Sequence, residues 1–124
     1  DQFDVVLSTE VFEHIPNPYK AHREIYRILK RGGAHVFTVP FGRQLYDDIV
    51  KASLAPNGSV LYLQEPEYHG DPLGNGKGIL VYNIFAQQMV DDLCKIGFLV
   101  KILQLRNSQY GILGDNLVHI AVKP

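Results

Sequence analysis

The residues best suited to chemistry form a short acidic and histidine-bearing run near the start of the chain. Glu10, Glu13 and His14 stand at positions i, i+3 and i+4, which places all three on one face if the turn is helical. An imidazole titrates near neutral pH, so His14 and His69 are candidate catalytic bases. Glu10 joins them if burial raises the pKa of its carboxyl group.

The remaining histidines and the single cysteine have patterns typical of structural roles. His35 and His119 alternate with apolar residues of predicted strands, which favours buried side chains with satisfied hydrogen bonds. His22 lies beside basic residues on a helix and is predicted to be solvated. Cys94 falls in an amphipathic segment and is predicted to be a buried, unreactive thiol. As the only cysteine, it excludes an internal disulfide.

Glu10, Glu13 and His14 must be positioned by the elements around them, which are predicted to be a strand, a helix and a second strand. Residues 3–8 are nearly all apolar, which is typical of a parallel strand covered on both faces. Asn17 and Pro18 predict a helix start, and Gly32-Gly33 predicts its end, after basic residues in the last turn. A strand over residues 34–39 then completes a right-handed βαβ unit.

The rest of the chain predicts further alternation of helices and strands. Residues 42–53 have a weaker helical pattern, residues 60–64 and 79–82 suggest short strands, and residues 65–78 read as an ordered surface loop. A helix over residues 89–96 ends at Gly97. Strands follow at residues 99–105 and 117–123. The whole chain, residues 1–124, is predicted to be a single α/β domain.

The bulk composition excludes several classes of partner. The net charge is −1 and no basic block occurs, so the electrostatic footprint of nucleic-acid or anionic-membrane binding is missing. No stretch approaches the roughly 20 apolar residues that cross a bilayer, and no signal segment opens the chain. We therefore expect a cytoplasmic protein without a nucleic-acid or membrane partner.

Two motifs together resemble class I S-adenosylmethionine-dependent methyltransferases, of the type 11 and type 23 kind. The segment FDVVLSTEVFEHI at residues 3–15, followed by RILKRGG at residues 27–33, resembles the family's fourth strand, fourth helix and fifth strand. Arg31 stands where the family commonly has proline, a mild departure in a turn. The later segments EYHGDP (67–72) and the Gly97-Phe98 pair also resemble family patterns.

The resemblance implies a fold and a cofactor. It predicts part of a Rossmann-like sheet in the order 4-5-7-6, with the last strand antiparallel, flanking helices and a substrate-side insertion at about residues 42–78. Ser8, Thr9 and Glu10 would border the methionine end of S-adenosylmethionine at the topological switch point. The alternative is that Ser8 and Thr9 only end the strand and cap a turn. The glycine-rich turn and the ribose-binding acid of the family would precede Asp1, so the chain is expected to be a carboxy-terminal half with little affinity for the cofactor.

The resemblance also implies which residues bind the molecule that accepts the methyl group. Pro40, Tyr68 and His69 would shape the substrate pocket, with His69 polarising a hydroxyl or amine on a small or glycan-like molecule. Some O-methyltransferases with a similar Glu-x-x-Glu-His pattern bind a divalent metal ion, which here implies Glu10, Glu13, His14 and His69, with Asp71 as an extra ligand. Metal-free relatives keep the Glu-His pair as a structural clip, and this alternative stays open.

A second hypothesis belongs to another class, a non-catalytic association module. Without a strand beside residues 3–8, an apolar sheet edge is left uncovered, and bare edges recruit other chains. The sequence therefore also predicts a homodimer formed through this edge or through the apolar face beside it.

Overall fold

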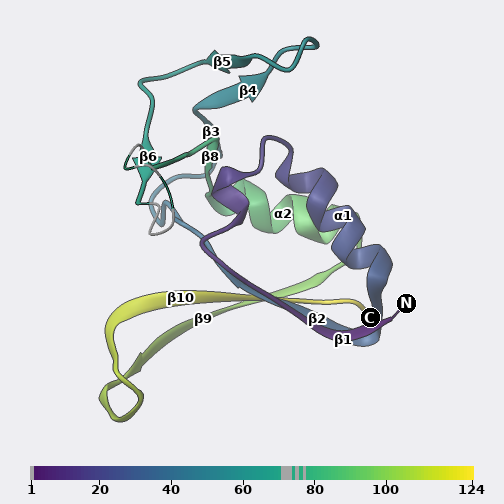
Figure 1. Ribbon diagram of the computed structural model, residues 1–124. Coiled ribbons are helices and arrows are strands. Elements are labelled where there is room, and N and C mark those ends of the chain that lie inside the picture. The colour runs from purple at the N-terminus through teal and green to yellow at the C-terminus, as the bar shows by residue number, and fades with distance from the viewer. Residues whose placement is uncertain (1, 71–73, 75, 77) are drawn as a thin grey trace. The chain divides into compact units, whose positions relative to one another are not determined.

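The computed structural model describes residues 2–70, 74, 76 and 78–124, which divide into two compact units (Figure 1). The first unit consists of Asp1–Thr9, Tyr19–Thr38 and Val90–Pro124. The second consists of Glu10–Pro18 and Val39–Met89. The assignment of residues 1–124 to a single domain stays a prediction.

The first unit is built on a four-stranded sheet in the order β1-β2-β10-β9. Its strands are β1 (Phe3–Thr9), β2 (Leu29–Thr38), β9 (Leu99–Asn107) and β10 (Ile112–Val122), the last two joined by the short helix η2 (Ser108–Tyr110). β1 and β2 are parallel, whereas β10 is antiparallel to both β2 and β9. This confirms the strand order and the antiparallel last strand that the sequence predicts.

Two helices lie on one face of this sheet (Figure 1), α1 (Pro18–Ile28) and α2 (Gln87–Ile96). α1 begins at Pro18 as predicted, but it ends at Ile28 and the next residue already belongs to β2. The reason is pairing with β1: the carbonyl of Ile28 accepts from the Gln2 amide at 2.7 Å, and Leu29 pairs with Phe3. Lys30 and Arg31, two of the basic residues predicted for the last turn of the helix, therefore belong to β2. Tertiary hydrogen bonds outweigh helix propensity here.

The covered face of the sheet carries an unusual core of histidines. His22 on α1, His35 on β2 and His119 on β10 are all 0% exposed. They surround Phe37, whose ring stacks on those of His35 and His119 at centroid distances of 4.4 and 5.1 Å. The predicted burial of His35 and His119 is confirmed. The prediction that His22 is solvated is wrong, because the buried stripe of α1 is wide enough to include it.

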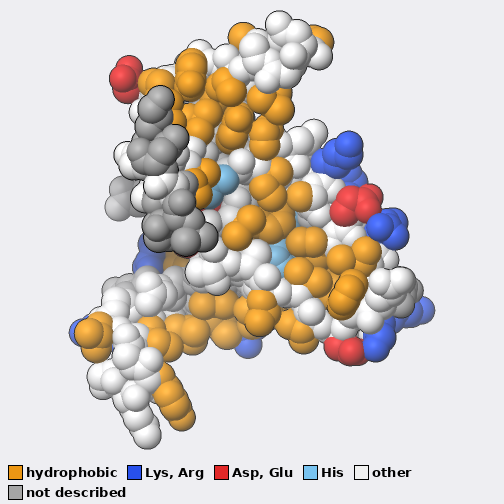
Figure 2. Space-filling model, viewed as in Figure 1, with side chains coloured by type: hydrophobic (Ala, Val, Ile, Leu, Met, Phe, Trp, Pro, Cys, Tyr) orange, Lys and Arg blue, Asp and Glu red, His pale blue; other side chains and the backbone are white. Residues whose placement is uncertain are grey.

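The opposite face of β1 is open, contrary to the prediction that both faces are covered. Phe3, Val5 and Leu7 are 47%, 53% and 73% exposed, because both helices pack on the other side. Figure 2 shows hydrophobic side chains at the surface over this sheet. Cys94 on α2 is also exposed, so the prediction of a buried thiol is wrong; it lies one residue beyond Leu93, which occupies the buried stripe.

The second unit consists of short strands around a small apolar core. It contains the one-turn helix η1 (Phe12–His14) and three two-stranded ladders. The ladders are β3 (Ile49–Val50) with β8 (Asn83–Ile84), β4 (Ala52–Leu54) with β5 (Val60–Tyr62), and β6 (Tyr68–His69) with β7 (Ile79–Leu80). The strands near residues 60 and 79 are confirmed. The helix predicted over residues 42–53 is wrong, because this backbone pairs with residues 82–84 instead.

The described part of the chain holds no helix with the length and apolar character needed to cross a bilayer.

Candidate functional site

The end of β1 is marked by an unusual backbone conformation. Glu10 follows the last residue of β1 with a φ of 49°, in the left-handed region that residues other than glycine seldom occupy. Such a conformation costs about 1–3 kcal/mol and persists only where the surrounding structure enforces it. The chain thereby makes a sharp turn at the carboxyl end of the strand, where the sequence predicts a cofactor edge.

The side chains at this strand end differ in what they can offer. The Ser8 hydroxyl is 2.9 Å from Nε2 of His35, so this side chain is engaged within its own unit. Thr9 is exposed. The backbone of residues 9 and 10 and the Thr9 side chain are therefore the groups at this edge that a ligand could meet.

η1 is held in place by the segment that runs from β7 to β8. The backbone amide of Tyr82 donates to the Glu13 carbonyl at 2.7 Å, and the Asn83 side chain donates to the Ile15 carbonyl at 2.9 Å. Nδ1 of His14 donates to the Leu80 carbonyl at 2.8 Å. These bonds fix both the backbone of η1 and the orientation of the His14 ring.

The same segment holds His69 from its other side. β7 pairs with β6 so that Ile79 lies opposite His69, and the Val81 amide donates to the Glu67 carbonyl at 2.9 Å. Gly78, with a φ of 81°, approaches the His69 backbone so closely that a Cβ would meet its carbonyl oxygen. The strand pairing thus brings His69 beside η1, although 55 residues separate it from His14.

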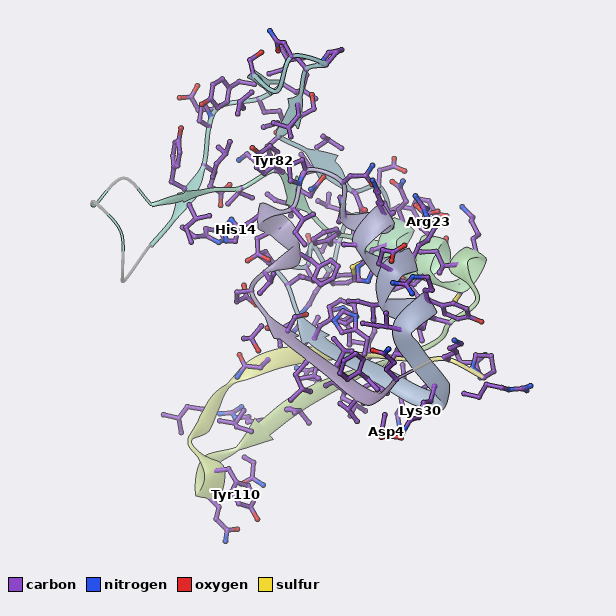
Figure 3. All side chains as sticks on the ribbon, turned by 45° about the vertical axis from the view of Figure 1, so that its right-hand side comes forward. Asp4, His14, Arg23, Lys30, Tyr82 and Tyr110 are labelled. Carbon is purple, nitrogen blue, oxygen red and sulfur yellow. The ribbon has the colours of Figure 1, made fainter. Side chains whose placement is uncertain are left out.

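Glu13, His14 and His69 form a compact group of side chains, which we call the Glu-His-His cluster. Each offers one ligand atom, and these atoms all lie within 4.8 Å of one another. Glu13 Oε1 is 3.6 Å from Nε2 of His14 and 3.6 Å from Nδ1 of His69. The two imidazole rings meet edge to face, with centroids 5.1 Å apart. Figure 3 labels His14, whose ring contacts Leu80 of β7.

Burial dominates the electrostatics of the Glu13 carboxyl group. The Glu13 side chain is 0% exposed, and this burial raises the pKa of its carboxyl group. Outside the cluster, Glu67 contacts Nε2 of His69 at 3.5 Å and Nζ of Lys51 at 2.6 Å. The hydrogen bond from Lys51 lowers the pKa of Glu67, so this outer carboxylate stays charged.

The predicted site residues are only partly brought together. Glu10 is not part of the cluster, because its left-handed backbone breaks the helical spacing that was expected to align it with Glu13. Tyr68 lies beside His69 on β6 and is 49% exposed, with its hydroxyl 3.5 Å from that of Tyr62. Pro40 contributes its carbonyl to the Phe85 amide at 3.2 Å. Asp71 lies outside the described residues.

Sequence reasoning missed Glu67 and Lys51 as partners of the cluster. The Glu-x-His spacing of residues 67–69, which leads into β6, was a usable signal, because side chains two apart in an extended segment share a face. No comparable signal marks Lys51, which reaches Glu67 through tertiary packing.

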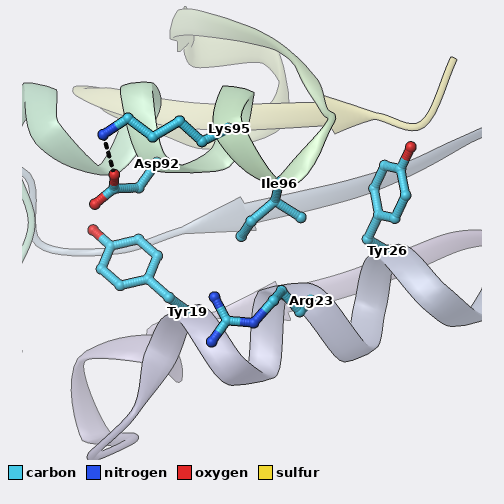
Figure 4. A pocket seen from close by; sticks show the side chains of 6 residues that line it. All are labelled: Tyr19, Arg23, Tyr26, Asp92, Lys95 and Ile96. Carbon is cyan, nitrogen blue, oxygen red and sulfur yellow. Dashed lines mark hydrogen bonds and ion pairs between the residues drawn. The ribbon is translucent and has the colours of Figure 1, made fainter.

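A separate pocket of about 600 Å³ opens between α1 and α2 in the first unit. It contains none of the predicted site residues, and Lys95 and Asp92 on its wall form an ion pair at 2.8 Å (Figure 4). Its lining consists of Tyr19, Arg23, Tyr26, Asp92, Lys95 and Ile96.

Comparison with known proteins shows what these features resemble. Residues 1–37 match the model of a methyltransferase domain family. The folds of S-adenosylmethionine-dependent methyltransferases from Listeria monocytogenes and Mesorhizobium loti match over 100% and 97% of this chain, with TM-scores of 0.60 and 0.58 and identities of 20% and 15%. The fold is that of a class I methyltransferase. The resemblance carried by residues 3–15 and 27–33 is thus confirmed.

A third methyltransferase structure has a ligand. The glycopeptide N-methyltransferase MtfA, complexed with S-adenosyl-L-homocysteine, matches 99% of this chain with a TM-score of 0.58 and 17% identity. The chain spans 62%, 62% and 55% of the lengths of these three structures. Among curated proteins, no relative matches the sequence.

Proposed function

We propose that this chain is part of an enzyme that transfers a methyl group from S-adenosylmethionine to a hydroxyl or amine of a small or glycan-like molecule. The observation that carries the proposal is the β1–β2 parallel pair, whose first strand ends in the exposed Thr9 and the sharply turned Glu10. In open α/β sheets, ligands bind at the carboxyl ends of the strands beside a topological switch point. The known structures with this fold support the choice of cofactor.

The cofactor, when bound, supplies a methyl group on a sulfonium that is already a good leaving group. The protein's main task is then to align the acceptor with that methyl group in a dry site. Thr9 and Glu10 would border the cofactor largely through backbone groups, since the Ser8 side chain is engaged with His35. Pro40, Tyr68 and His69 would form the acceptor side. His69 is 33% exposed against 14% for His14, which favours it as the group that polarises the acceptor.

The test is isothermal titration of S-adenosylhomocysteine into the full-length protein that contains this chain. We expect saturable binding between about 1 μM and 1 mM, the usual range of substrate constants. Thr9→Trp places a bulky ring at the proposed edge and should weaken binding at least about tenfold, or about 1.4 kcal/mol. Glu24→Trp, on the exposed side of α1, is the matched control and should bind normally. Absence of heat in the unaltered protein refutes the proposal.

Residues 1–124 alone are expected to bind S-adenosylhomocysteine weakly or not at all. The chain spans 55–62% of the solved methyltransferases that it resembles, so it would carry only part of a cofactor site. Tight binding by this segment alone would contradict that part of the proposal.

An association module is the second candidate, and the exposed edge of the sheet favours it. Among the described residues, β1 pairs on one side only, and Phe3, Val5 and Leu7 are exposed along it. Unpaired strand edges with apolar side chains template pairing with another chain. The occupant we propose is a second copy, through antiparallel pairing of two β1 strands.

Sedimentation velocity of residues 1–124 tests the dimer. We expect a species of twice the 14.0 kDa monomer mass, which Leu7→Lys shifts to monomer because it places a charge at the edge. Leu113 has the same 73% exposure but lies on β10, so Leu113→Lys is the control and should leave the dimer intact. A monomer at all concentrations refutes the prediction.

A further inference from the structure

The inference starts from the buried carboxylate of Glu13. Its side chain is 0% exposed, and neither of its oxygens accepts a hydrogen bond from any residue that the structure describes. Placing an ionised carboxylate in an apolar interior without donors is strongly unfavourable. Buried charges are therefore paired with a counter-charge or coordinate a metal ion.

The two histidines face Glu13 with the nitrogens that carry no proton in a neutral ring. His14 donates from Nδ1 to the Leu80 carbonyl, which can only accept, so Nε2 presents a lone pair. His69 points Nε2 at the Glu67 carboxylate, which Lys51 holds in place. By the same reasoning, Nδ1 of His69 presents its lone pair toward Glu13. Three acceptor atoms thus converge on one point.

The distances within the cluster fit a shared cation. Both inner nitrogens are 3.6 Å from Glu13 Oε1, beyond the range of an N–H···O hydrogen bond. A tetrahedral Zn²⁺ ion with bonds of about 2.0–2.1 Å holds neighbouring ligand atoms roughly 3.4 Å apart. These two separations match ligands around an ion more closely than groups bonded directly to one another, and all three ligand atoms lie within 4.8 Å of one another.

We propose that Glu13, His14 and His69 bind one divalent transition-metal ion, with Zn²⁺ as the preferred ion. Two imidazoles and one carboxylate are a ligand set that zinc accepts while keeping a fourth position open for water or an oxygen donor of a substrate. All three ligands belong to the second unit, so the proposal does not depend on cofactor binding by the sheet.

The surroundings of the two histidines are those of metal ligands. A ligating histidine almost always donates its other ring N–H to a carbonyl or carboxylate, which fixes the tautomer and raises ligand basicity. The Leu80 carbonyl does this for His14 at 2.8 Å, and the Glu67 carboxylate lies 3.5 Å from Nε2 of His69, in position for the same role. One backbone segment, residues 79–83, holds both η1 and β6, so the ligands are brought together before an ion arrives.

Metal titration of the purified protein, without a histidine tag and after treatment with a chelator, tests the site. We expect one Zn²⁺ per chain by competition with a chromophoric chelator, and intense visible absorption when Co²⁺ replaces Zn²⁺ in a tetrahedral site. Glu67→Gln should weaken Zn²⁺ binding about 10- to 100-fold, the usual effect of losing an outer partner. His69→Gln and Glu13→Gln remove ligands and should exceed that loss. Glu24→Gln, an exposed acid on α1, is the matched control and should bind like the unaltered protein.

The outcomes distinguish a metal ion bound by the Glu-His-His cluster from a proton shared within it. Binding of Zn²⁺ that survives both His69→Gln and Glu13→Gln overturns the assignment. So does the absence of stoichiometric Zn²⁺ binding, in which case the cluster is held by a shared proton. The Co²⁺ spectrum of the unaltered protein needs no variant, so it decides the question even if a substitution impairs folding. Titration with S-adenosylhomocysteine on the same sample reports separately on the proposed methyltransferase function.

Discussion

Lowering the pH from about 7 to 5 is expected to remove most of the stability of the first unit, because three buried histidines must then accept protons. Burial lowers the pKa of His22 to about 3, and those of His35 and His119 to about 4. For His22, the neighbouring His35 and His119 add to this effect. In the unfolded chain, all three titrate near pH 6.5.

The direction of the change in stability follows from which state, folded or unfolded, binds more protons. Below about pH 6.5 the unfolded chain binds more protons than the folded one, so the free energy of unfolding falls as the pH falls. Each histidine contributes about 1.4 kcal/mol per pH unit between its two pKa values. At about pH 5 the loss is roughly 2 kcal/mol for each and roughly 6 kcal/mol for the three, which approaches the whole stability of a small domain. The loss slows only below the folded-state pKa values near 4 and 3.

Urea denaturation at a series of pH values measures this effect. His119→Gln removes one titrating group and should lower the slope of unfolding free energy against pH by about 1.4 kcal/mol per unit, whatever its effect at neutral pH. Tyr110→Phe, at a position 76% exposed, should leave the slope unchanged. Stability that stays constant from pH 7 to 5 would show that these histidines take up protons as readily in the folded protein as in the unfolded chain.

Gly33→Ala is expected to destabilise the protein by about 3 kcal/mol, near the upper end of the usual cost of overpacking. A Cβ at this position would lie 2.9 Å from the Lys30 carbonyl oxygen and 3.0 and 3.1 Å from those of Asp4 and Phe3. All three are backbone atoms of β1 and β2, which cannot move aside as the end of a side chain can. The register of β1 on β2 shifts between Phe3 and Val5, at the same place.

The measurement is the midpoint of urea denaturation at neutral pH, converted to free energy with the measured slope. Gly114→Ala is the matched control, since it also lies in a strand of this sheet and a Cβ there would meet nothing closer than 3.9 Å. It should change stability by less than about 1 kcal/mol. Equal effects of the two substitutions would mean that close packing of β1 on β2 is not the reason why position 33 needs glycine.

The surface ion pair between Lys30 and Asp4 joins the same two strands, at 2.9 Å (Figure 3). Both side chains are largely exposed, so solvent screens the pair and it contributes little. The pairing of β1 with β2 therefore rests on backbone hydrogen bonds and on the absence of a side chain at Gly33.

Local patterns determined much of this protein. The apolar run of residues 3–8, the Pro18 helix start and the Gly97 stop each act within a few residues, so β1, α1 and α2 were predictable from the sequence. Combined with the resemblance, they also predicted the strand order of the sheet. Glu13, His14 and His69 were named as candidate ligands because carboxylate and imidazole groups are recognisable by type alone.

Tertiary structure decided what these patterns leave open. Pairing with β1 ended α1 at Ile28, and pairing with β8 turned the weak helical pattern near residue 49 into strand, because long-range hydrogen bonds outweigh small helix propensities. Packing around Phe37 buried His22. Only the fold could bring His69 beside Glu13 and His14, because these residues are more than 50 positions apart and meet through strand pairing. Only the backbone conformation of Glu10 could exclude it from the cluster.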